Sequence, residues 1–198
     1  MAVGMMIDLF RKVSVADRMI RRGFWPADYP LGTKLRGKKV GIVGMGRIGA
    51  EVAKLLQAFG CIVFYFSKKR KPSVPFQFFE TLTEMAMNSD ALVITCALTK
   101  ETYHLINASV MAALGDGGMI INVARGAIVD EEEMVKRLVD GELGGAGLDV
   151  FEGEPAVPEE LLRLNNVVLS PHRAAFTAES LEALCDVVME NLETFFSS

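Results

Sequence analysis

The feature that most constrains the fold of this 198-residue chain is a glycine-rich turn between an apolar run and a helical segment. The apolar run covers residues 39–43, and the helical segment covers residues 47–59. Three glycines spaced in this way allow a tight turn, a close approach of a diphosphate to the backbone, and close packing of the helix on the strand. The motif therefore predicts a dinucleotide-binding unit, the alternative being an ordinary glycine-rich turn. Its candidate cofactor-binding residues are Gly44, Gly46, Arg47, Ile48 and Gly49.

Short apolar runs alternate with helical segments along most of the chain. This alternation predicts an α/β fold with a doubly wound parallel sheet, right-handed crossovers and helices on both faces. Asp130 with Glu133 predicts the start of one of these helices, and Gly141 predicts its end. The expected strands are 39–43, 61–66, 91–95, 118–123, 145–150 and 167–170. The expected helices between them are 47–59, 81–87, 107–113, 131–139 and 159–163.

The two ends of the chain have helical patterns of their own. Met5, Met6 and Leu9 recur at helical spacing, and Ser14 with Asp17 is typical of the cap of a second short helix. Residues 23–37 are rich in helix-breaking positions and predict an extended arm, in which we expect Trp25 to be buried against another surface. Residues 177–196 predict a long amphipathic helix, with an apolar stripe formed by Leu181, Leu184, Val188, Leu192 and Phe195.

Composition argues against several classes of function. The chain carries 21 Lys and Arg against 25 Asp and Glu, and this net charge of -4 disfavours nucleic acid or an anionic membrane as the main partner. The apolar first ten residues contain Asp8 and lack a basic leader, so they predict neither a signal peptide nor a membrane span. Cys61, Cys96 and Cys185 lie in apolar segments without metal-ligand spacing, which predicts reduced core residues, no metal site and a cytoplasmic location.

The end of the second expected strand indicates which dinucleotide is bound. Domains that bind NAD place an acidic residue there to accept from the ribose hydroxyls, but this chain has Ser67. Ser67 is followed by the basic run Lys68-Lys69-Arg70-Lys71. Because a hydroxyl and a cation would hold a 2′-phosphate that a carboxylate would repel, we predict NADP(H), with Ser67 and Lys68 as its contacts. The alternatives are a solvated basic loop and a basic run of the nuclear-localisation type.

Three polar side chains, Arg125, Glu154 and His172, each follow an expected strand. An arginine can grip a carboxylate in two places, a histidine can transfer a proton near neutral pH, and a neighbouring glutamate favours the protonated histidine. Together they suit the reduction of a 2-oxo acid, although each alone could be an ordinary loop or surface residue. Asp149 could hold a nicotinamide carboxamide or cap a turn, and we interpret His104 as structural.

Several segments occur along the chain in a fixed order, namely residues 40–49, 89–94, 122–126, 147–152, 154–155 and 170–172. Together they resemble the D-isomer-specific 2-hydroxyacid dehydrogenases. Residues 22–26 and the Ser67-Lys68 pair are further similar to the plant glyoxylate/hydroxypyruvate and hydroxyphenylpyruvate reductases. The resemblance implies that Arg125, Glu154 and His172 are catalytic, that Asp149 contacts the nicotinamide amide, and that the arm forms a homodimer.

The same resemblance implies that part of the active site is absent. Members of the family begin with a substrate-binding domain of roughly a hundred residues and return to it after their last long helix. We therefore divide the chain into interdomain-type helices with a dimerisation arm (1–36), an NADP-binding Rossmann-type domain (37–176) and a C-terminal helix (177–198). The first and last helices are suspected of having faced another domain.

Two functions follow as hypotheses from this reading. The first is the NADPH-dependent reduction of glyoxylate, hydroxypyruvate or a similar small 2-oxo acid, with this chain a truncated or cofactor-domain form. The second is a dimeric NADP-binding module without catalysis.

Overall fold

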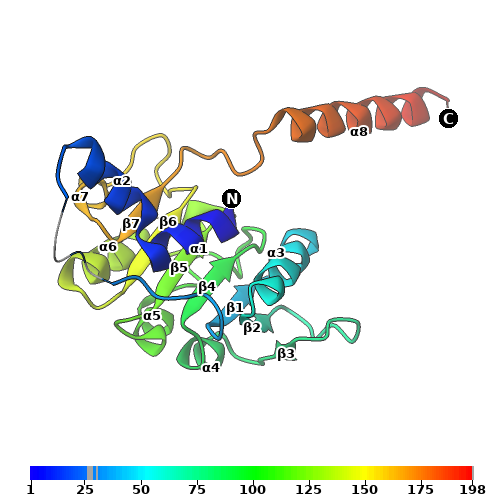
Figure 1. Ribbon diagram of the computed structural model, residues 1–198. Helices are drawn as coiled ribbons and strands as arrows, with labels where there is room; N and C mark the ends of the chain where they lie inside the picture. Colours follow the sequence, from blue (N-terminus) through cyan, green and yellow to red (C-terminus); the bar gives the residue numbers. More distant parts are fainter. Residues whose placement is uncertain (26–28, 30, 198) are drawn as a thin grey trace.

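A computed structural model describes residues 1–25, 29 and 31–197, which form a parallel seven-stranded sheet covered by helices on both faces (Figure 1). The expected doubly wound α/β fold is confirmed. Pro26 and Pro30, which contributed to the prediction of an extended arm, lie outside the described residues. The strands are β1 (Lys39–Val43), β2 (Ile62–Phe66), β3 (Gln77–Phe78), β4 (Ala91–Ile94), β5 (Met119–Asn122), β6 (Gly145–Leu148) and β7 (Val167–Leu169).

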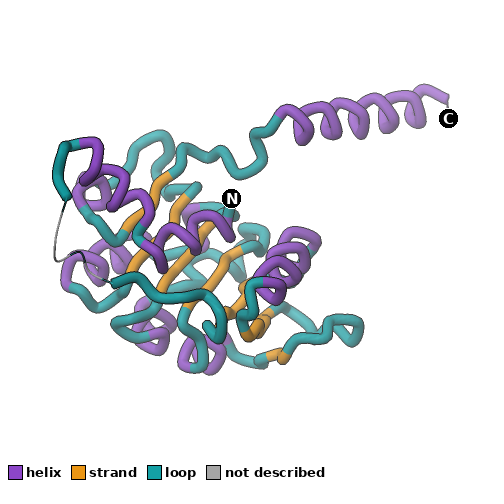
Figure 2. The backbone as a smooth tube through the Cα atoms, viewed as in Figure 1, coloured by secondary structure: helices purple, strands orange, loops and turns teal. Residues whose placement is uncertain are grey.

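The helices alternate with the strands as the sequence pattern predicts (Figure 2). In α6, Asp130 accepts a hydrogen bond from the Glu133 N–H at 3.2 Å, and Gly141 ends the helix in the left-handed conformation. The helices are α1 (Ala2–Arg11), α2 (Val13–Arg21), α3 (Arg47–Ala58), α4 (Leu82–Met87), α5 (Ala108–Leu114), α6 (Glu131–Asp140), α7 (Glu159–Arg163) and α8 (Ala178–Ser197), with a short 3-10 turn, η1 (Gly126–Ile128).

The strands are arranged in the order β3-β2-β1-β4-β5-β6-β7 and separate two hydrophobic layers. Because successive residues of a strand point to opposite faces, neighbours in β4 belong to different layers. Leu92 and Ile94 pack in the layer that contains residues of α4, α5 and α6, whereas Val93 packs in the layer that contains residues of α1 and α3. This burial on both faces explains why the strands are continuous apolar runs rather than alternating ones.

Helix α1 packs into the domain itself. Met5, Met6, Leu9 and Phe10 are all buried, so the apolar face of this helix, which we suspected of facing another domain, is covered within this chain. Its close approach to the sheet depends on glycine in β6, because a Cβ added to Gly147 would lie only 2.9 Å from the Met5 Cβ. Part of the glycine cluster at residues 141–147 therefore serves packing between elements.

Several local expectations at the N-terminal end are corrected by tertiary contacts. Helix α2 begins at Val13 rather than after Ser14, because Ser14 is bound by Asp8. The Asp8 carboxylate accepts from the Ser14 N–H at 2.7 Å and also from the Ser14 hydroxyl. The expected cap is therefore wrong. Lys12, in the left-handed conformation with φ 56°, forms the corner between α1 and α2.

Two side chains expected to be buried are exposed. Trp25 is 85% exposed, and Cys185 is exposed on α8, whereas Cys61 is buried as expected and Cys96 is partly buried. The two exposed residues belong to segments that lie at the margin of the domain rather than in its core. The prediction that Cys185 is a core residue is therefore wrong, whereas Trp25, which we expected to be buried against another surface, is not covered by the described residues.

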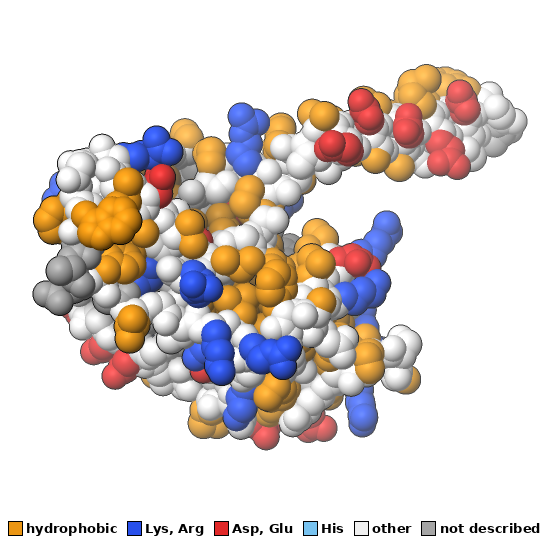
Figure 3. Space-filling view, in the orientation of Figure 1, with side chains coloured by type: hydrophobic (Ala, Val, Ile, Leu, Met, Phe, Trp, Pro, Cys, Tyr) orange, Lys and Arg blue, Asp and Glu red, His pale blue; other side chains and the backbone are white. Residues whose placement is uncertain are grey.

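Helix α8 extends away from the rest of the molecule (Figures 1 and 3). It forms over the range that the amphipathic pattern predicts, but none of its described residues is buried. Figure 3 shows acidic and apolar side chains both facing solvent along its length. Within residues 1–25, 29 and 31–197, no helix has the length and apolar character needed to cross a lipid bilayer.

Candidate active site

The glycine-rich turn lies where the strand order reverses. Strand β1 pairs with β2 on one side and β4 on the other, and in open parallel sheets ligands bind beyond the carboxyl ends of the strands at such a point. Gly44 follows β1 with φ 97°, and a Cβ there would lie 2.6 Å from the Cys96 Cα. Gly49 is equally constrained, because its Cβ would lie 2.3 Å from the Gly44 carbonyl oxygen.

The start of α3 fits a diphosphate group. Gly46 precedes the helix and is exposed, and a Cβ built on it would meet nothing within 4 Å. A side chain there would therefore fill space that is open above the free N–H groups of the first helical turn, which favour an anion. Arg47 and Ile48, the first residues of the helix, are also exposed.

The basic loop after β2 joins the glycine-rich turn in one groove. Ser67 and Lys68 line this groove together with Gly44 and Gly46, so the structure brings these sequence-predicted residues together. The Ser67 hydroxyl donates to the Lys69 carbonyl at 2.7 Å. The remaining lining residues of the groove are Met45, Lys69, Lys71, Thr95, Cys96 and Ala97.

Lys71 has a role that its place in a basic run did not reveal. Its Nζ donates to the Met45 carbonyl at 2.5 Å, which connects the basic loop to the glycine-rich turn. Its backbone N–H donates to the Tyr65 hydroxyl at 2.9 Å, which connects the same loop to β2. Lys71 therefore fixes the basic loop beside the turn. The sequence showed only that Lys71 belongs to a run of four cations, which does not single it out for this role.

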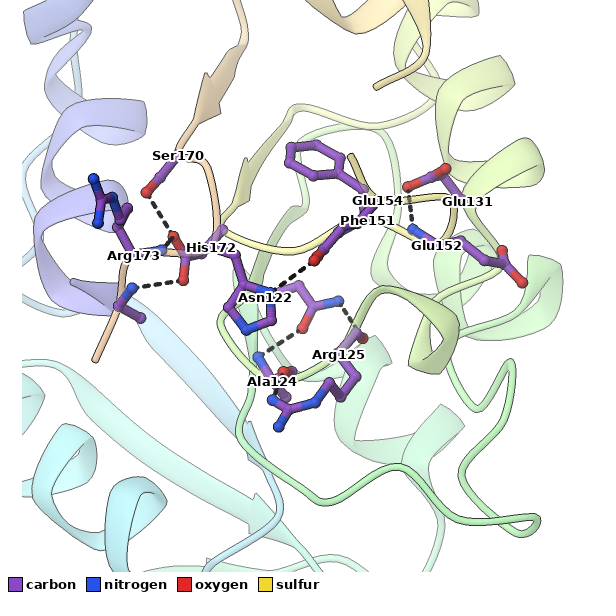
Figure 4. Close-up of polar contacts among 12 residues, drawn as sticks. Asn122, Ala124, Arg125, Glu131, Phe151, Glu152, Glu154, Ser170, His172 and Arg173 are labelled. Atoms are coloured by element: carbon purple, nitrogen blue, oxygen red, sulfur yellow. Dashed lines mark hydrogen bonds and ion pairs between the residues drawn. The ribbon is translucent and has the colours of Figure 1, made fainter. Parts of the chain in front are cut away.

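His172 and Glu154 form a hydrogen-bonded pair (Figure 4). His172 Nδ1 lies 2.8 Å from Glu154 Oε2, and Glu154 Oε1 accepts from the Phe151 N–H at 2.9 Å. The bond from His172 lowers the pKa of Glu154, and the Phe151 N–H and the charge of Arg125 act in the same direction. The His172 side chain is 45% exposed, and its Nε2 has no hydrogen-bond partner among the described residues.

Asp149 holds the loop that carries His172. Its buried carboxylate accepts from the Ser170 hydroxyl at 2.5 Å, the Arg173 N–H at 2.7 Å and the Ala174 N–H at 2.8 Å. The Asp149 carbonyl also accepts from the His172 N–H at 2.8 Å. Of the two roles open for Asp149 in the sequence, capping of this turn is present, and contact with a nicotinamide stays a prediction.

Arg125 follows β5 and is exposed beside the His172–Glu154 pair (Figure 4). Its position depends on Asn122, a buried residue whose structural role the sequence did not disclose. The Asn122 side chain accepts from the Ala124 N–H at 3.0 Å and donates to the Arg125 carbonyl at 2.9 Å. The Arg125 guanidinium donates to the Ala124 carbonyl at 2.5 Å. The structure thus brings Arg125, Glu154 and His172 to one edge of the sheet.

Comparison with known proteins gives a consistent set of matches. Residues 3–174 match the family model described as the D-isomer specific 2-hydroxyacid dehydrogenase, NAD binding domain. A glyoxylate/hydroxypyruvate reductase of Arabidopsis thaliana is 51% identical over 100% of this chain and 62% of its own length. A hydroxyphenylpyruvate reductase of Plectranthus scutellarioides is 48% identical over 100% of this chain and 63% of its own length.

The solved structures include a similar fold with a bound dinucleotide. The NADPH-dependent glyoxylate/hydroxypyruvate reductase of Sinorhizobium meliloti, in complex with NADP and malonate, superposes with a TM-score of 0.94 at 40% identity. The match covers 100% of this chain and 63% of that protein. The chain therefore spans less than two thirds of the length of the relatives it matches.

Proposed function

Because this chain belongs to the D-isomer specific 2-hydroxyacid dehydrogenases, we propose that it takes part in the NADPH-dependent reduction of a small 2-oxo acid such as glyoxylate or hydroxypyruvate. The observation that carries this proposal is the 2.8 Å His172–Glu154 pair, placed beside Arg125 at the edge of the sheet that also bears the glycine-rich turn. The names of the similar reductases support the substrate class.

The residues of this chain divide the chemistry among them. A bound nicotinamide dinucleotide would supply the hydride. The Arg125 guanidinium binds the substrate carboxylate and polarises the adjacent carbonyl. His172 donates a proton from Nε2 to the carbonyl oxygen, while Glu154 accepts from Nδ1 and stabilises the protonated ring. The lowered pKa of Glu154 keeps its carboxylate charged for this purpose near neutral pH.

The proposed cofactor site uses the residues that line the groove and the start of α3. Gly44, Gly46 and Gly49 let the diphosphate approach the backbone, and Arg47 and Ile48 lie on the first turn of the helix. Ser67 and Lys68 would hold the 2′-phosphate, since they line the same groove as the turn. Asp149 would contact the nicotinamide amide. These assignments belong to the proposal, and each can be tested by substitution.

The role of His172 is tested by replacing it with asparagine. Asparagine tolerates the left-handed conformation of this residue, φ 55°, and its amide can still donate toward Glu154. We expect oxidation of NADPH by glyoxylate or hydroxypyruvate to fall by about 10²–10⁴-fold, the usual contribution of a positioned general acid. NADPH affinity, measured by fluorescence titration, should be unchanged.

Two outcomes would contradict the role that we propose for His172. One is turnover that survives in His172→Asn at the wild-type rate. The other concerns pH, because the imidazole must carry a proton for reduction. The wild-type rate should therefore decrease as pH rises and the ring becomes neutral, and a rate that does not depend on pH would contradict the proposal.

Cofactor preference is tested by reversing one charge in the groove. Lys68→Asp places a carboxylate where the 2′-phosphate is proposed to bind, so we expect NADPH affinity to fall by about 10-fold or more while NADH affinity changes little. Lys136→Asp on the exposed surface of α6 is the matched control. Equal preference for NADPH and NADH in both wild type and Lys68→Asp would contradict the proposal that Lys68 holds the 2′-phosphate.

A dimeric NADP-binding module without catalysis is the second candidate. The exposure of Arg125 and of 45% of the His172 side chain favours it, because proton transfer and carboxylate binding are strongest where water is excluded. The exposed Trp25 supports the proposed homodimer through the arm. This module is favoured if the chain sediments as a dimer, binds NADPH tightly and gives no turnover. Turnover by the 198-residue chain would exclude it.

A further inference from the structure

Both histidines of the chain bind glutamates of a single turn, residues 151–155. His172 pairs with Glu154, as described above, and His104 Nε2 lies 3.0 Å from Glu152 Oε1. His104 comes from the segment between β4 and α5, which is distant in sequence from the turn. The proposed function uses only the His172 pair, so the second pair on the same turn requires its own explanation.

His104 also binds the turn that follows Arg125. Its backbone N–H donates to the Ala127 carbonyl in η1 at 2.9 Å. Its own backbone is in the left-handed conformation, φ 47°, which non-glycine residues adopt only when their surroundings hold them there. The backbone of His104 therefore contacts the Arg125 side of the site, and its ring contacts the Glu154 side.

The His104 ring is fixed by its neighbours. It stacks on Tyr103 with ring centroids 4.0 Å apart and an interplanar angle of 13°. The Tyr103 hydroxyl donates to the same Glu152 oxygen at 3.2 Å. On the other side of the ring, Asp130 Oδ2 lies 4.0 Å from His104 Nδ1. The charged and titratable groups facing His104 are thus Glu152, Asp130 and Tyr103.

The two catalytic turns touch each other directly. A Cβ added to Gly126, the residue after Arg125, would lie 2.0 Å from the Phe151 carbonyl carbon. The Glu131 carboxylate accepts from the Glu152 N–H at 3.0 Å and so ties α6 to the same turn. Burial raises the pKa of Glu131, and the charges of Glu152 and Glu154 raise it further. Three carboxylates therefore lie close together, and the His104 ring is a hydrogen-bonding partner for one of them.

We propose that His104 is a positioning residue, which holds the turn of Arg125 against the turn of Glu154 and thereby sets the Glu154–His172 pair. Its importance for catalysis rests on the proposed function. Without the His104 ring, Glu152 keeps the Tyr103 hydroxyl but loses its contact with the imidazole and is repelled by Glu131 and Glu154. The 151–155 turn then shifts, and Glu154 is no longer held at His172 Nδ1. His104 itself touches neither substrate nor cofactor in this arrangement.

The test measures the pKa of the Glu154 carboxyl by NMR in the cofactor-free chain. In wild type the hydrogen bond from His172 lowers this pKa. In His104→Leu we expect the Glu154 pKa to rise toward the ordinary value of a glutamate, since Glu154 is no longer held at His172 Nδ1.

His104→Gln is the matched conservative variant. Its side-chain amide can donate to Glu152 from nearly the place of Nε2, and it meets the same left-handed backbone as leucine. We expect it to keep the Glu154 pKa lowered as in wild type, so a rise confined to His104→Leu reports the lost contact rather than the lost imidazole. A folded His104→Leu protein with the wild-type Glu154 pKa would overturn the proposal.

Glu152 variants test the contact from its other side, at a residue that is exposed. Glu152→Gln removes the charge but keeps an acceptor for His104, whereas Glu152→Ala removes both. The Glu154 pKa should be higher in Glu152→Ala than in Glu152→Gln, and equal values would refute the proposal even where His104→Leu does not fold. Because the titration needs no turnover, inactivity of the wild type would count against the proposed function alone.

Discussion

Asp149 positions His172 with a carboxylate that is completely buried. Burying a charge is costly unless hydrogen bonds replace its hydration, and here one hydroxyl and two backbone N–H groups do so. Replacing this carboxylate by a methyl group would leave those donors unsatisfied inside the domain. His172 is thus held on a loop whose conformation is fixed by a single buried side chain.

Glu154 gives the stability of the protein a defined pH dependence. Its folded-state pKa lies below the ordinary value of about 4.3, chiefly because of the bond from His172. Its contribution to the free energy of unfolding is therefore fully present above that ordinary value and is lost as pH falls through the lowered folded-state value. We expect wild type to be more stable than Glu154→Gln at neutral pH, with a difference that vanishes in acid.

Urea unfolding of the two proteins over a series of pH values measures this difference. Glu160→Gln, at an exposed position of α7, is the control and should differ little from wild type throughout. A difference between wild type and Glu154→Gln that grows as pH falls would contradict the lowered pKa.

Residue types and spacing could predict that Arg125, Glu154 and His172 lie together, because each follows a strand at the same edge of the sheet. The His104–Glu152 contact could not be predicted, since it joins two loops 48 residues apart, and no local pattern encodes it. The same limit applies to Ser14. Its local spacing to Asp17 is typical of a cap, but Asp8 competes for its hydroxyl from the preceding helix. Contacts across the fold decided both cases.

At the scale of elements, six of the seven strands could be predicted because each is an apolar run buried on both faces of the sheet. Strand β3 was missed. It has two residues, Gln77 and Phe78, of which neither is fully buried, and its pairing with β2 is set by the fold rather than by its own sequence. Short edge strands leave too little pattern to separate them from a loop.

Because α1 packs closely on β6, adding one methyl group at Gly147 should lower the stability of the domain. Gly147→Ala would place its Cβ 2.9 Å from the Met5 Cβ, so α1 must shift or the strand must bend. We expect the free energy of unfolding to fall by about 1–3 kcal/mol, the usual cost of overpacking a core. Gly117→Ala is the matched control, because nothing lies within 4 Å of the added carbon. Equal stability of the two variants in urea would refute this account.

At the scale of the whole molecule, the sheet with its two layers is complete without α8. None of the described residues of α8 is buried, and Figure 1 shows the helix standing apart from the sheet. The chain spans 62% of the length of its Arabidopsis thaliana relative, so that protein contains sequence beyond the matched part. The amphipathic pattern predicted the helix correctly, but the pattern could not say what its apolar stripe contacts.

Deleting residues 178–198 should therefore leave the domain stable. We expect its free energy of unfolding to change by no more than about 0.5 kcal/mol, as for exposed positions in general. Urea unfolding at low protein concentration measures this change. A loss of several kcal/mol would mean that α8 stabilises the domain through contacts with the sheet layers or with a second copy.

The bond from Lys71 to the Met45 carbonyl has a consequence for how a dinucleotide binds. Ordering a flexible side chain on association costs about 0.5–1.5 kcal/mol each, and ordering a loop costs more. In this chain the basic loop and the glycine-rich turn are joined by their own contacts, so that entropy is lost during folding rather than at the encounter. In the proposed function, the groove is therefore a preorganised site, and a phosphate that binds there spends little free energy on ordering the loop.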